Sequence, residues 1–293
     1  DSAAYQVLRL IAWGHHNLET EYSAVVALAR KAIGGENFYE LKSLRRQLPV
    51  LLKSAGLSAI PQHSTADCSD SVSNRFAADH DYNLLIKQEG RQNGEGVKRV
   101  RGQSEFGKAI AMQAGLKSSS TTLQKYVEGG VLRHSLVALD GKVLAQFTAE
   151  QIKTRYDKSF QAPTVIQLVE DSQVREQADR FVSCHRLSGY IGMDFIREHE
   201  TGHRYLIDVN PRINSLSHLG ALAGKDLSQA LHDRLAGGIV NPGQTQQQSG
   251  THATIFPYEW LRDRNSQYLQ SAASDTPWDD LGVLRRILAS IRL

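Results

Sequence analysis

Residues 190–214, with the sequence YIGMDFIREHETGHRYLIDVNPRIN, predict two antiparallel strands joined by a turn near Thr201. In a hairpin folded about that residue, Asp194 lies directly opposite Asp208, because antiparallel partners are equidistant from the turn. Side chains alternate between the two faces of a strand, so Asn210 shares the face of Asp208. Three apolar side chains are expected on the opposite face, toward a core: Phe195, Ile207 and Val209. The pattern therefore predicts a row of polar oxygen atoms on one face of a sheet.

Two facing carboxylates destabilise a strand pair, and a divalent cation removes that penalty. Mg²⁺ prefers oxygen ligands and leaves positions for phosphate and water, so Asp194, Asp208 and Asn210 are candidate ligands of Mg²⁺, or of Mn²⁺ in its place. Arg212 follows two residues later and can hold a phosphate or carboxylate in a planar fork. For any single residue, a solvated strand face is the simpler interpretation, whereas the whole set favours a metal–phosphate site.

A second candidate site is the loop that follows the predicted strand 82–87. The loop contains Gly90, Gly94 and Gly96, and the chain is extended again over 97–101, which predicts a hairpin. Glycine allows backbone N–H groups to approach phosphates, and Lys87 at the strand end can neutralise them. The P-loop motif does not occur in the sequence. Considered alone, Lys87 is better explained as an edge-strand charge that prevents aggregation; beside the carboxylate hairpin, we expect it to contact phosphate.

The rest of the chain alternates between helical and strand-like patterns. Helices are expected at 19–33, 41–52 (bent or shortened at Pro49), 104–114, 173–186 and 219–235 (broken at Gly224), and further strands at 123–127, 132–139, 143–147 and 253–256. Asp140-Gly141 is typical of a two-residue hairpin turn. Hairpin strands with interspersed helices predict an α+β (mixed α/β) fold.

Length, net charge, apolar runs and cysteine content limit the class of protein. At about 100–200 residues per domain, 293 residues suggest two domains or one large composite domain. The formal net charge of +3 is too small to favour nucleic acid as the main partner, and no apolar run approaches the roughly 18 residues of a membrane span. Cys68 and Cys184 lack metal-ligand spacing and are typical of a reducing, cytoplasmic setting. The oligomeric state stays open, a homo-oligomer included.

The order of these segments resembles the ATP-grasp ligases: Lys87, the glycine loop, Gln124-Lys125-Tyr126-Val127, Asp194 and Asp208-Val209-Asn210-Pro211-Arg212. The resemblance covers about residues 41–235, and the D-V-N-P-R segment is its most specific part. It implies an ATP cleft between two α+β subdomains. Residues 41–126 would form the smaller one with a glycine lid, 127–293 the larger one with the metal site, and 1–40 the remnant of a truncated N-terminal domain.

The resemblance also implies a role for each candidate residue. Lys87 would contact ATP phosphates beneath the lid of Gly90, Gly94 and Gly96. The strand at Gln124, Lys125, Tyr126 and Val127 would be the hinge, which binds adenine through backbone groups of Lys125 and Val127. Asp194, Asp208 and Asn210 would hold Mg²⁺, Arg212 would face the transferred phosphate, and Arg45 lies near the place of a basic phosphate contact. Arg133-His134 and Asn214 are similar to positions of the biotin carboxylase branch, and Arg155 is placed to meet substrate.

Two positions depart from the pattern. Asp208 replaces the more usual glutamate, which shortens the ligand by one methylene, and Gln124 stands where an acidic residue is common in parts of the family.

The implied reaction is ATP-dependent activation of a carboxylate as an acyl phosphate, followed by attack of an amine or a related nucleophile. The implied partners are ATP and small-molecule carboxylate and amine substrates, with no nucleic acid and no membrane. One alternative is bicarbonate activation through carboxyphosphate, as in relatives of biotin carboxylase and carbamoyl-phosphate synthetase. A second is an ATP-binding regulatory module without turnover. The least favoured is nucleic-acid binding by the basic hairpin around Lys98, Arg99 and Arg101.

Overall fold

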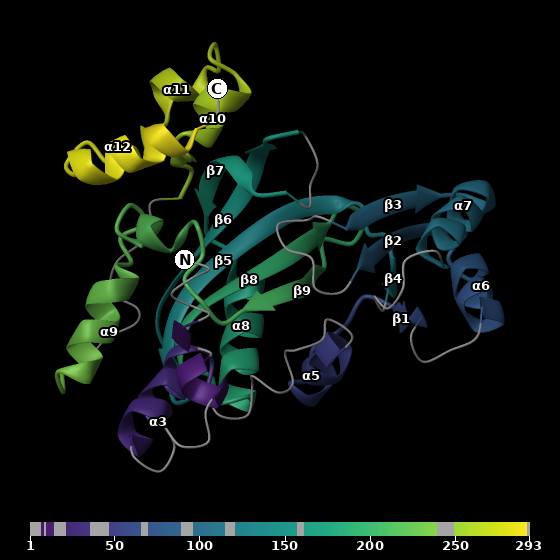
Figure 1. Ribbon diagram of the computed structural model, residues 1–293, viewed down its shortest axis with the longest axis horizontal. Helices are drawn as coiled ribbons and strands as arrows, with labels where there is room; N and C mark the ends of the chain where they lie inside the picture. Colours follow the sequence, from purple (N-terminus) through teal and green to yellow (C-terminus); the bar gives the residue numbers. More distant parts are fainter. Residues whose placement is uncertain are drawn as a thin grey trace.

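The computed structural model describes residues 7–8, 10–14, 22–35, 47–65, 70–88, 96–114, 121–156, 161–238 and 249–291. These residues form two β-sheets that lie side by side (Figure 1). The larger sheet contains, in spatial order, β11 (Ala273–Ser274), β10 (His252–Thr254), β7 (Pro163–Val169), β6 (Lys142–Thr154), β5 (Gly129–Leu139), β8 (Gly189–Glu198) and β9 (Arg204–Asn210). The smaller contains β1 (Gln62–Ser64), β4 (Thr121–Lys125), β2 (Asn83–Gln88) and β3 (Val97–Arg101). The mixed α+β class is confirmed.

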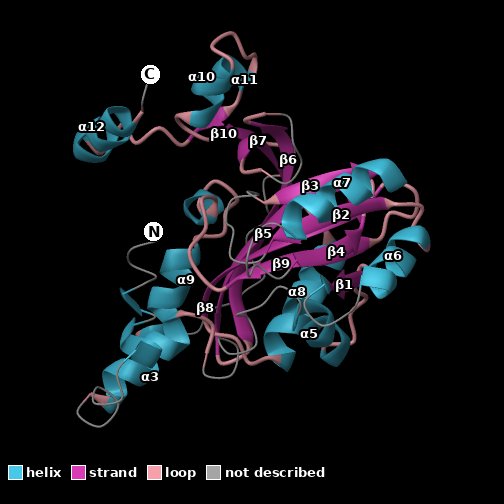
Figure 2. Cartoon of the chain, turned by 45° about the vertical axis from the view of Figure 1, so that its right-hand side comes forward, coloured by secondary structure: helices cyan, strands magenta, loops and turns pink. Residues whose placement is uncertain are grey.

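The smaller sheet has one face covered by α6 (Asp70–Ala78) and α7 (Gln103–Ala114), which lie on it in Figure 2. Alternate strand residues and one side of each helix form a single hydrophobic cluster: Ala77, Leu84, Ile86, Val100, Phe106, Ala109 and Leu123. The predicted hairpin of β2 and β3 is confirmed, with Lys87 opposite Val97. The period-2 apolar pattern of β2 thus places its core residues against α6 and α7.

The larger sheet is covered on both faces. Helices α8 (Ser172–Cys184) and α5 (Leu48–Ser54) pack on one face, where Phe181 meets Leu136, Met193 and Phe195. The 3-10 turn η4 (Ser217–Gly220) and α9 (Leu227–Leu235) pack on the other, against apolar residues of β5, β6 and β7. Because both faces of the central strands are covered, β7 is a nearly continuous buried run, which the alternation rule does not detect.

The ends of the described chain flank the larger sheet. The π-helical turn η1 (Leu10–Gly14) packs on α3 (Ser23–Ala32). Beyond α3, Ile33 forms an isolated bridge to Gly189. The C-terminal part contains α10 (Tyr258–Arg262), α11 (Tyr268–Ser271) and α12 (Leu281–Ser290), which lie beyond β10 in Figure 1.

Several predicted boundaries can be compared with the structure. Of the two alternatives expected at Pro49, a bent or a shortened helix, the described residues agree with the shortened one: α5 begins at Leu48, and Pro49 lies in its first turn, where the N–H groups need no acceptor. The break predicted at Gly224 within the helical segment 219–235 is confirmed: Gly224 adopts a φ of +70°, and the Asp226 side chain then caps a new helix, α9. The strand predicted at 143–147 extends to Thr154.

The chain passes from the smaller sheet to the larger one between Lys125 and Gly129. Helix α5, however, contributes Leu51, Leu52 and Ala55 to the core of the larger sheet. A division into segments 1–40, 41–126 and 127–293 therefore stays a proposal. Within the described residues, no helix has the length and apolarity that a transmembrane segment requires.

Candidate functional site

The predicted carboxylate pair is present on the β8–β9 hairpin. Asp194 pairs directly with Asp208, and Gly192 pairs with Asn210, so the expected register is confirmed at these positions. On the other side of β8, Asp194 pairs with Arg133 of β5. We call the face of the larger sheet that carries Asp194, Asp208 and Asn210 the carboxylate face. Across three neighbouring strands, this face carries a row of three charged side chains: Arg133, Asp194 and Asp208.

The register changes immediately beyond this row. Phe195 pairs with Leu206, so Ile207 is an extra residue between two paired positions, a β-bulge. The prediction that Ile207 points into the core is therefore wrong: Leu206 and Val209 enter the core, whereas Ile207 is only half-buried. The bulge lies directly before Asp208, and bulges change the direction in which neighbouring side chains point.

Arg133 is held by three acceptors. Its Nη1 donates to Oδ2 of Asp194, and its Nη2 donates to Gln151 Oε1 and to the Gln161 carbonyl, both at 2.9 Å. The side chains of Arg133 and Asp194 are 16% and 20% exposed. An ion pair this far removed from water is fixed in position, since either partner alone would be left as a costly buried charge.

The charges around Asp194 act in opposite directions. Burial raises the pKa of Asp194, the Arg133 guanidinium lowers it, and the Asp208 carboxylate raises it again. The repulsion between the two carboxylates is therefore present in the folded chain. A cation between them would favour the charged forms of both.

A second polar row lies next to the first, formed by Ser135, Gly192 and Asn210. The Asn210 Nδ2 donates to Asp208 Oδ2 at 2.8 Å, which turns the amide toward the carboxylates. Above Gly192 lies the Asn214 side chain, which exchanges hydrogen bonds with Ser135 Oγ at 3.0 and 3.2 Å. A Cβ at position 192 would lie 2.5 Å from Asn214 Nδ2, so glycine there allows the loop after β9 to close over the sheet.

Arg212 lies in that loop. Its backbone N–H donates to the Asn210 carbonyl at 2.8 Å, and its Nη1 approaches the Ile213 carbonyl at 3.4 Å. Its positive charge lowers the pKa of Asp194, so it acts on the same charged row. Because its side chain has only the 3.4 Å hydrogen-bonding contact to the Ile213 carbonyl among the described residues, the half-buried guanidinium can turn toward an anion bound over the carboxylates.

The donor set fits a hard divalent cation. Asp194, Asp208 and Asn210 offer only oxygen ligands, as Mg²⁺ prefers. In the part of the chain that the structure describes, no cluster of three His, Cys, Asp or Glu side chains could hold a metal ion. A cation at this row would therefore be bound by the two carboxylates and the Asn210 amide oxygen, and phosphate or water oxygens would complete its ligands.

The predicted phosphate-binding residues lie on the smaller sheet. Lys87 is in β2, one residue before its end, and pairs with Val97 and Thr122. Gly96 directly precedes β3 with a φ of +75°, a conformation that favours glycine. Gly90, Gly94 and Arg45 lie outside the described residues. The structure thus places Lys87 and the metal-site candidates on different sheets.

The predicted hinge joins the two sheets. The buried Gln124 side chain donates to Gln62 Oε1 at 3.2 Å. The N–H of Lys125 donates to the Pro61 carbonyl at 2.9 Å, and that of Tyr126 to the Asn83 carbonyl at 3.0 Å. Among the described residues, the N–H of Val127 has no backbone acceptor. Of the backbone N–H groups of Lys125 and Val127, only that of Val127 is therefore available to a ligand.

Two arginines complete the site although their contacts were not predicted. Arg133 was noted only by resemblance, and its pairing with Asp194 joins strands that are far apart in sequence. The Arg99 guanidinium lies 3.4 Å from the centroid of the Tyr126 ring and 3.5 Å from Glu128. Alternation on β3 is the signal that could have placed Arg99 on one face, but no local pattern identifies its partner.

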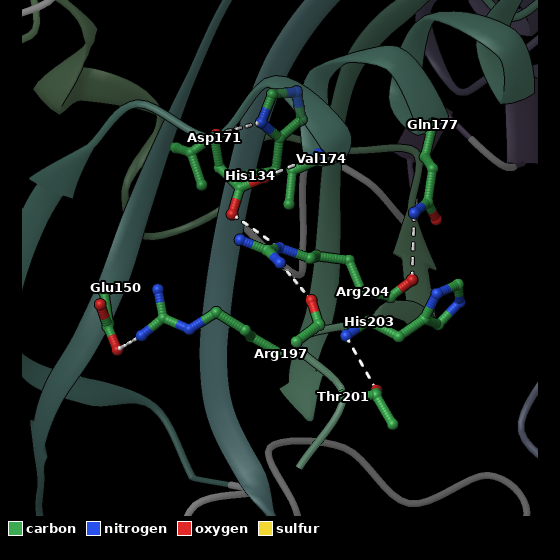
Figure 3. Close-up of polar contacts among 11 residues, drawn as sticks. His134, Glu150, Asp171, Val174, Gln177, Arg197, Thr201, His203 and Arg204 are labelled. Carbon is green, nitrogen blue, oxygen red and sulfur yellow. Dashed lines mark hydrogen bonds and ion pairs between the residues drawn. The ribbon is translucent and has the colours of Figure 1, made fainter. Parts of the chain in front are cut away.

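The opposite face of the same hairpin carries other ion pairs, shown in Figure 3. Arg204 contacts Asp171, which also caps α8 by accepting from the Val174 N–H. Arg197 contacts Glu150 at 2.5 Å. These pairs oppose unlike charges only, so they stabilise the packing of α8 and β6 without creating a demand for a cation.

Comparison with known proteins identifies the domain. A family model of the ATP-grasp domain matches residues 51–215, which is more than half of the chain. A search of curated proteins finds no match.

Solved structures with similar folds include three enzymes. Carboxyaminoimidazole ribonucleotide synthase from Aspergillus clavatus, complexed with ATP, has 15% identity and a TM-score of 0.58 over 73% of this chain and 56% of that one. The biotin carboxylase domain of Hydrogenobacter thermophilus 2-oxoglutarate carboxylase, with MgADP, ADP and bicarbonate, has 17% identity and a TM-score of 0.60, over 85% and 60%. Biotin carboxylase from Campylobacter jejuni has 17% identity and a TM-score of 0.59, over 80% and 56%. The chain thus spans no more than 60% of the length of these structures.

Proposed function

The chain belongs to the ATP-grasp family, and on this premise we propose that it is an ATP-dependent ligase that activates a carboxylate as an acyl phosphate for attack by an amine or a related nucleophile. The observation that carries the proposal is the direct pairing of Asp194 with Asp208, with Asn210 on the same face, inside the segment that the family model matches. Facing carboxylates with an amide beside them offer the oxygen ligands that Mg²⁺ prefers, and MgATP would supply the cation.

The proposal assigns roles to candidate residues of both sheets. Asp208, Asn210 and Asp194 would hold Mg²⁺, which when bound neutralises phosphate oxygens. Arg212 would orient the transferred phosphate, and Lys87 would neutralise the triphosphate from the smaller sheet. The free N–H of Val127 would donate to an acceptor nitrogen of adenine. ATP would therefore lie between the two sheets, with Gly90, Gly94 and Gly96 covering its phosphates.

The reaction requires no protein nucleophile. A carboxylate oxygen of the substrate forms a bond to the γ-phosphorus, while the bond between that phosphorus and the bridging oxygen of ADP breaks. The amine then attacks the acyl carbon, phosphate leaves, and the amine loses a proton to solvent. The chain's own contribution is to position the reactants and to stabilise negative charge on the phosphoryl oxygens.

A second acceptor is supported by one observation. The fold is similar to that of a biotin carboxylase domain whose structure contains bicarbonate. In that case bicarbonate would replace the organic carboxylate, and the first product would be carboxyphosphate. A screen for ADP release distinguishes the two: dependence on bicarbonate alone favours the second acceptor, whereas dependence on a pooled organic carboxylate with pooled amines favours the first.

The ligase proposal is tested by replacing Asp208. We expect Asp208→Ala to abolish ADP release, because the bound triphosphate loses a cation ligand that no neighbouring residue replaces. Glu176→Ala, which removes an exposed carboxylate from α8 on the opposite face, is the matched control and should retain full activity. ADP release by Asp208→Ala at the rate of the unmodified chain would refute the proposal. ATP binding measured by calorimetry, without ADP formation on any carboxylate, would favour a regulatory module.

A further inference from the structure

We propose that the Arg133 guanidinium is a tethered counter-ion of the metal site, so that this chain binds one divalent cation together with ATP, not two. The inference rests on the proposed function, because it concerns the cation that would hold ATP on the carboxylate face. It gives Arg133 the role of a positioning residue: it acts through Asp194 and need not touch the nucleotide.

The position of Arg133 is fixed from several directions. Nη1 donates to Asp194, and Nη2 donates at 2.9 Å to both Gln151 Oε1 and the Gln161 carbonyl. These acceptors come from β8, from β6 and from the segment before β7, so movement of the guanidinium would break contacts on three segments. The charge is therefore part of the site before any ligand binds.

The hydrogen bonds along the charged row leave three side-chain oxygen atoms that could bind a cation. Oδ2 of Asp194 accepts from Arg133, and Oδ2 of Asp208 accepts from Asn210. Within the described residues, the Oδ1 atoms of both carboxylates and of Asn210 accept no hydrogen bond. Three oxygen atoms from the chain, completed by phosphate and water, supply the six ligands of one Mg²⁺.

Charge also disfavours a second cation. Asp194 and Asp208 are balanced by Arg133 on the same row and Arg212 in the adjacent loop. A second dication beside Asp194 would find its carboxylate already paired and would be repelled by the fixed guanidinium a few ångströms away. Without Arg133, Asp194 would offer both oxygen atoms and an uncompensated charge.

The test counts bound cations. Mn²⁺ is titrated into the chain with a non-hydrolysable ATP analogue, and free Mn²⁺ is followed by electron paramagnetic resonance. We expect one Mn²⁺ per chain for the unmodified protein and two for Arg133→Met, which replaces the unbranched apolar stem of the side chain and removes its charge. Arg133→Lys keeps the charge and should restore the count to one.

The matched control is Arg197→Met. It breaks the ion pair with Glu150 on the opposite face of the same strands, and the count should stay at one. Two Mn²⁺ per unmodified chain would overturn the inference while leaving the proposed function intact, and so would a count of one for folded Arg133→Met. No nucleotide-dependent Mn²⁺ binding by the unmodified chain would overturn both. The count for the unmodified chain needs no variant, so the inference can be refuted even if Arg133→Met does not fold.

Discussion

Arg133 and His134 are neighbours on β5, and their side chains lie on opposite faces of the larger sheet. Arg133 meets the carboxylates, whereas His134 is buried beneath α8 between Thr148 and Gln146. The Gln146 Nε2 donates to Asp179 at 3.0 Å, so its Oε1 accepts from Nε2 of His134, and Nδ1 is left to accept from the Thr148 hydroxyl. Both ring nitrogen atoms of the neutral imidazole are thus hydrogen-bonded, and a second ring proton would add a positive charge in a buried position.

His134 should therefore make stability depend on pH. Burial lowers the pKa of His134 to about 4, well below its value of 6.5 in an unfolded chain. Between these values the unfolded chain binds more protons, so the free energy of unfolding falls as pH decreases. We expect His134 to account for a loss of about 2 kcal/mol between pH 7 and pH 5.

Urea denaturation of the unmodified chain and of His134→Gln at both pH values checks this expectation. Glutamine can keep the hydrogen bonds but does not titrate, so the variant should lose less stability at pH 5. His199→Gln replaces an exposed histidine and serves as the control. Equal pH dependence in the unmodified chain and in His134→Gln would show that His134 plays no part.

Among the elements, the β8–β9 hairpin and the loop that follows it act as one unit. Asn214 ties the loop to the sheet: its side chain bonds to Ser135, and its Oδ1 accepts from the Leu216 N–H at 2.9 Å and from Ser217 Oγ at 3.1 Å. This arrangement needs the open space above Gly192. The loop carries Arg212, so its closure places a positive charge beside the carboxylates.

Gly192→Ala should break this closure. The added methyl group would lie 2.5 Å from Asn214 Nδ2, and we expect a loss of about 1–3 kcal/mol in the free energy of unfolding. In an Asn214→Ala background the same substitution should cost much less, because the clash is absent. A double-mutant cycle measured by urea denaturation detects this coupling.

Gly107→Ala in α7 is the control for that cycle. A Cβ there meets nothing within 4 Å, so the substitution should be neutral or stabilising. Equal costs of Gly192→Ala in the two backgrounds would contradict the proposed role of the loop.

At the level of the whole molecule, the arrangement of the two sheets depends on a short connection. Besides the backbone hydrogen bonds of Lys125 and Tyr126, the His199 N–H donates to the Glu128 carbonyl at 3.0 Å, which ties the connection to the end of the β8–β9 hairpin. Arg99 of β3 adds a stacking contact with Tyr126 and an ion pair with Glu128. The β2–β3 hairpin, the connection between the two sheets and the β8–β9 hairpin are thus linked by contacts around one segment.

Arg99→Met should loosen this link. Loss of the cation–π contact is expected to cost about 1–2 kcal/mol, and residues 125–128 should exchange amide hydrogens faster. Hydrogen exchange followed by mass spectrometry measures the effect. Arg101→Met, at an exposed position two residues along the same strand, should leave exchange in this segment unchanged. The same protection in Arg99→Met as in the unmodified chain would contradict the linking role.

Local sequence features were sufficient to predict many of the hairpins and turns of this molecule. Alternation and turn chemistry predicted the β2–β3 and β8–β9 hairpins and the Asp140-Gly141 turn, because hairpin partners are close in sequence. The facing pair Asp194–Asp208 was also predicted, but the register expected from the turn does not hold beside the turn itself: Phe195 pairs with Leu206, and the extra residue Ile207 then brings Asp208 opposite Asp194. The bulge at Ile207 was not predicted, since strict alternation was assumed along the whole strand and nothing in the local sequence marks the extra residue.

Packing between distant segments decided the rest. The pairing of β5 with β8 sets Arg133 against Asp194, the space over Gly192 receives Asn214, and Arg99 reaches Tyr126 from another strand. A residue's own neighbours in the chain carry no record of which distant strand will lie beside it, because that choice is made by burial of the two faces of the whole sheet. Hence the facing pair of Asp194 and Asp208 could be predicted from the order of the residues, whereas the position of the Arg133 guanidinium beside that pair became visible only in the folded chain.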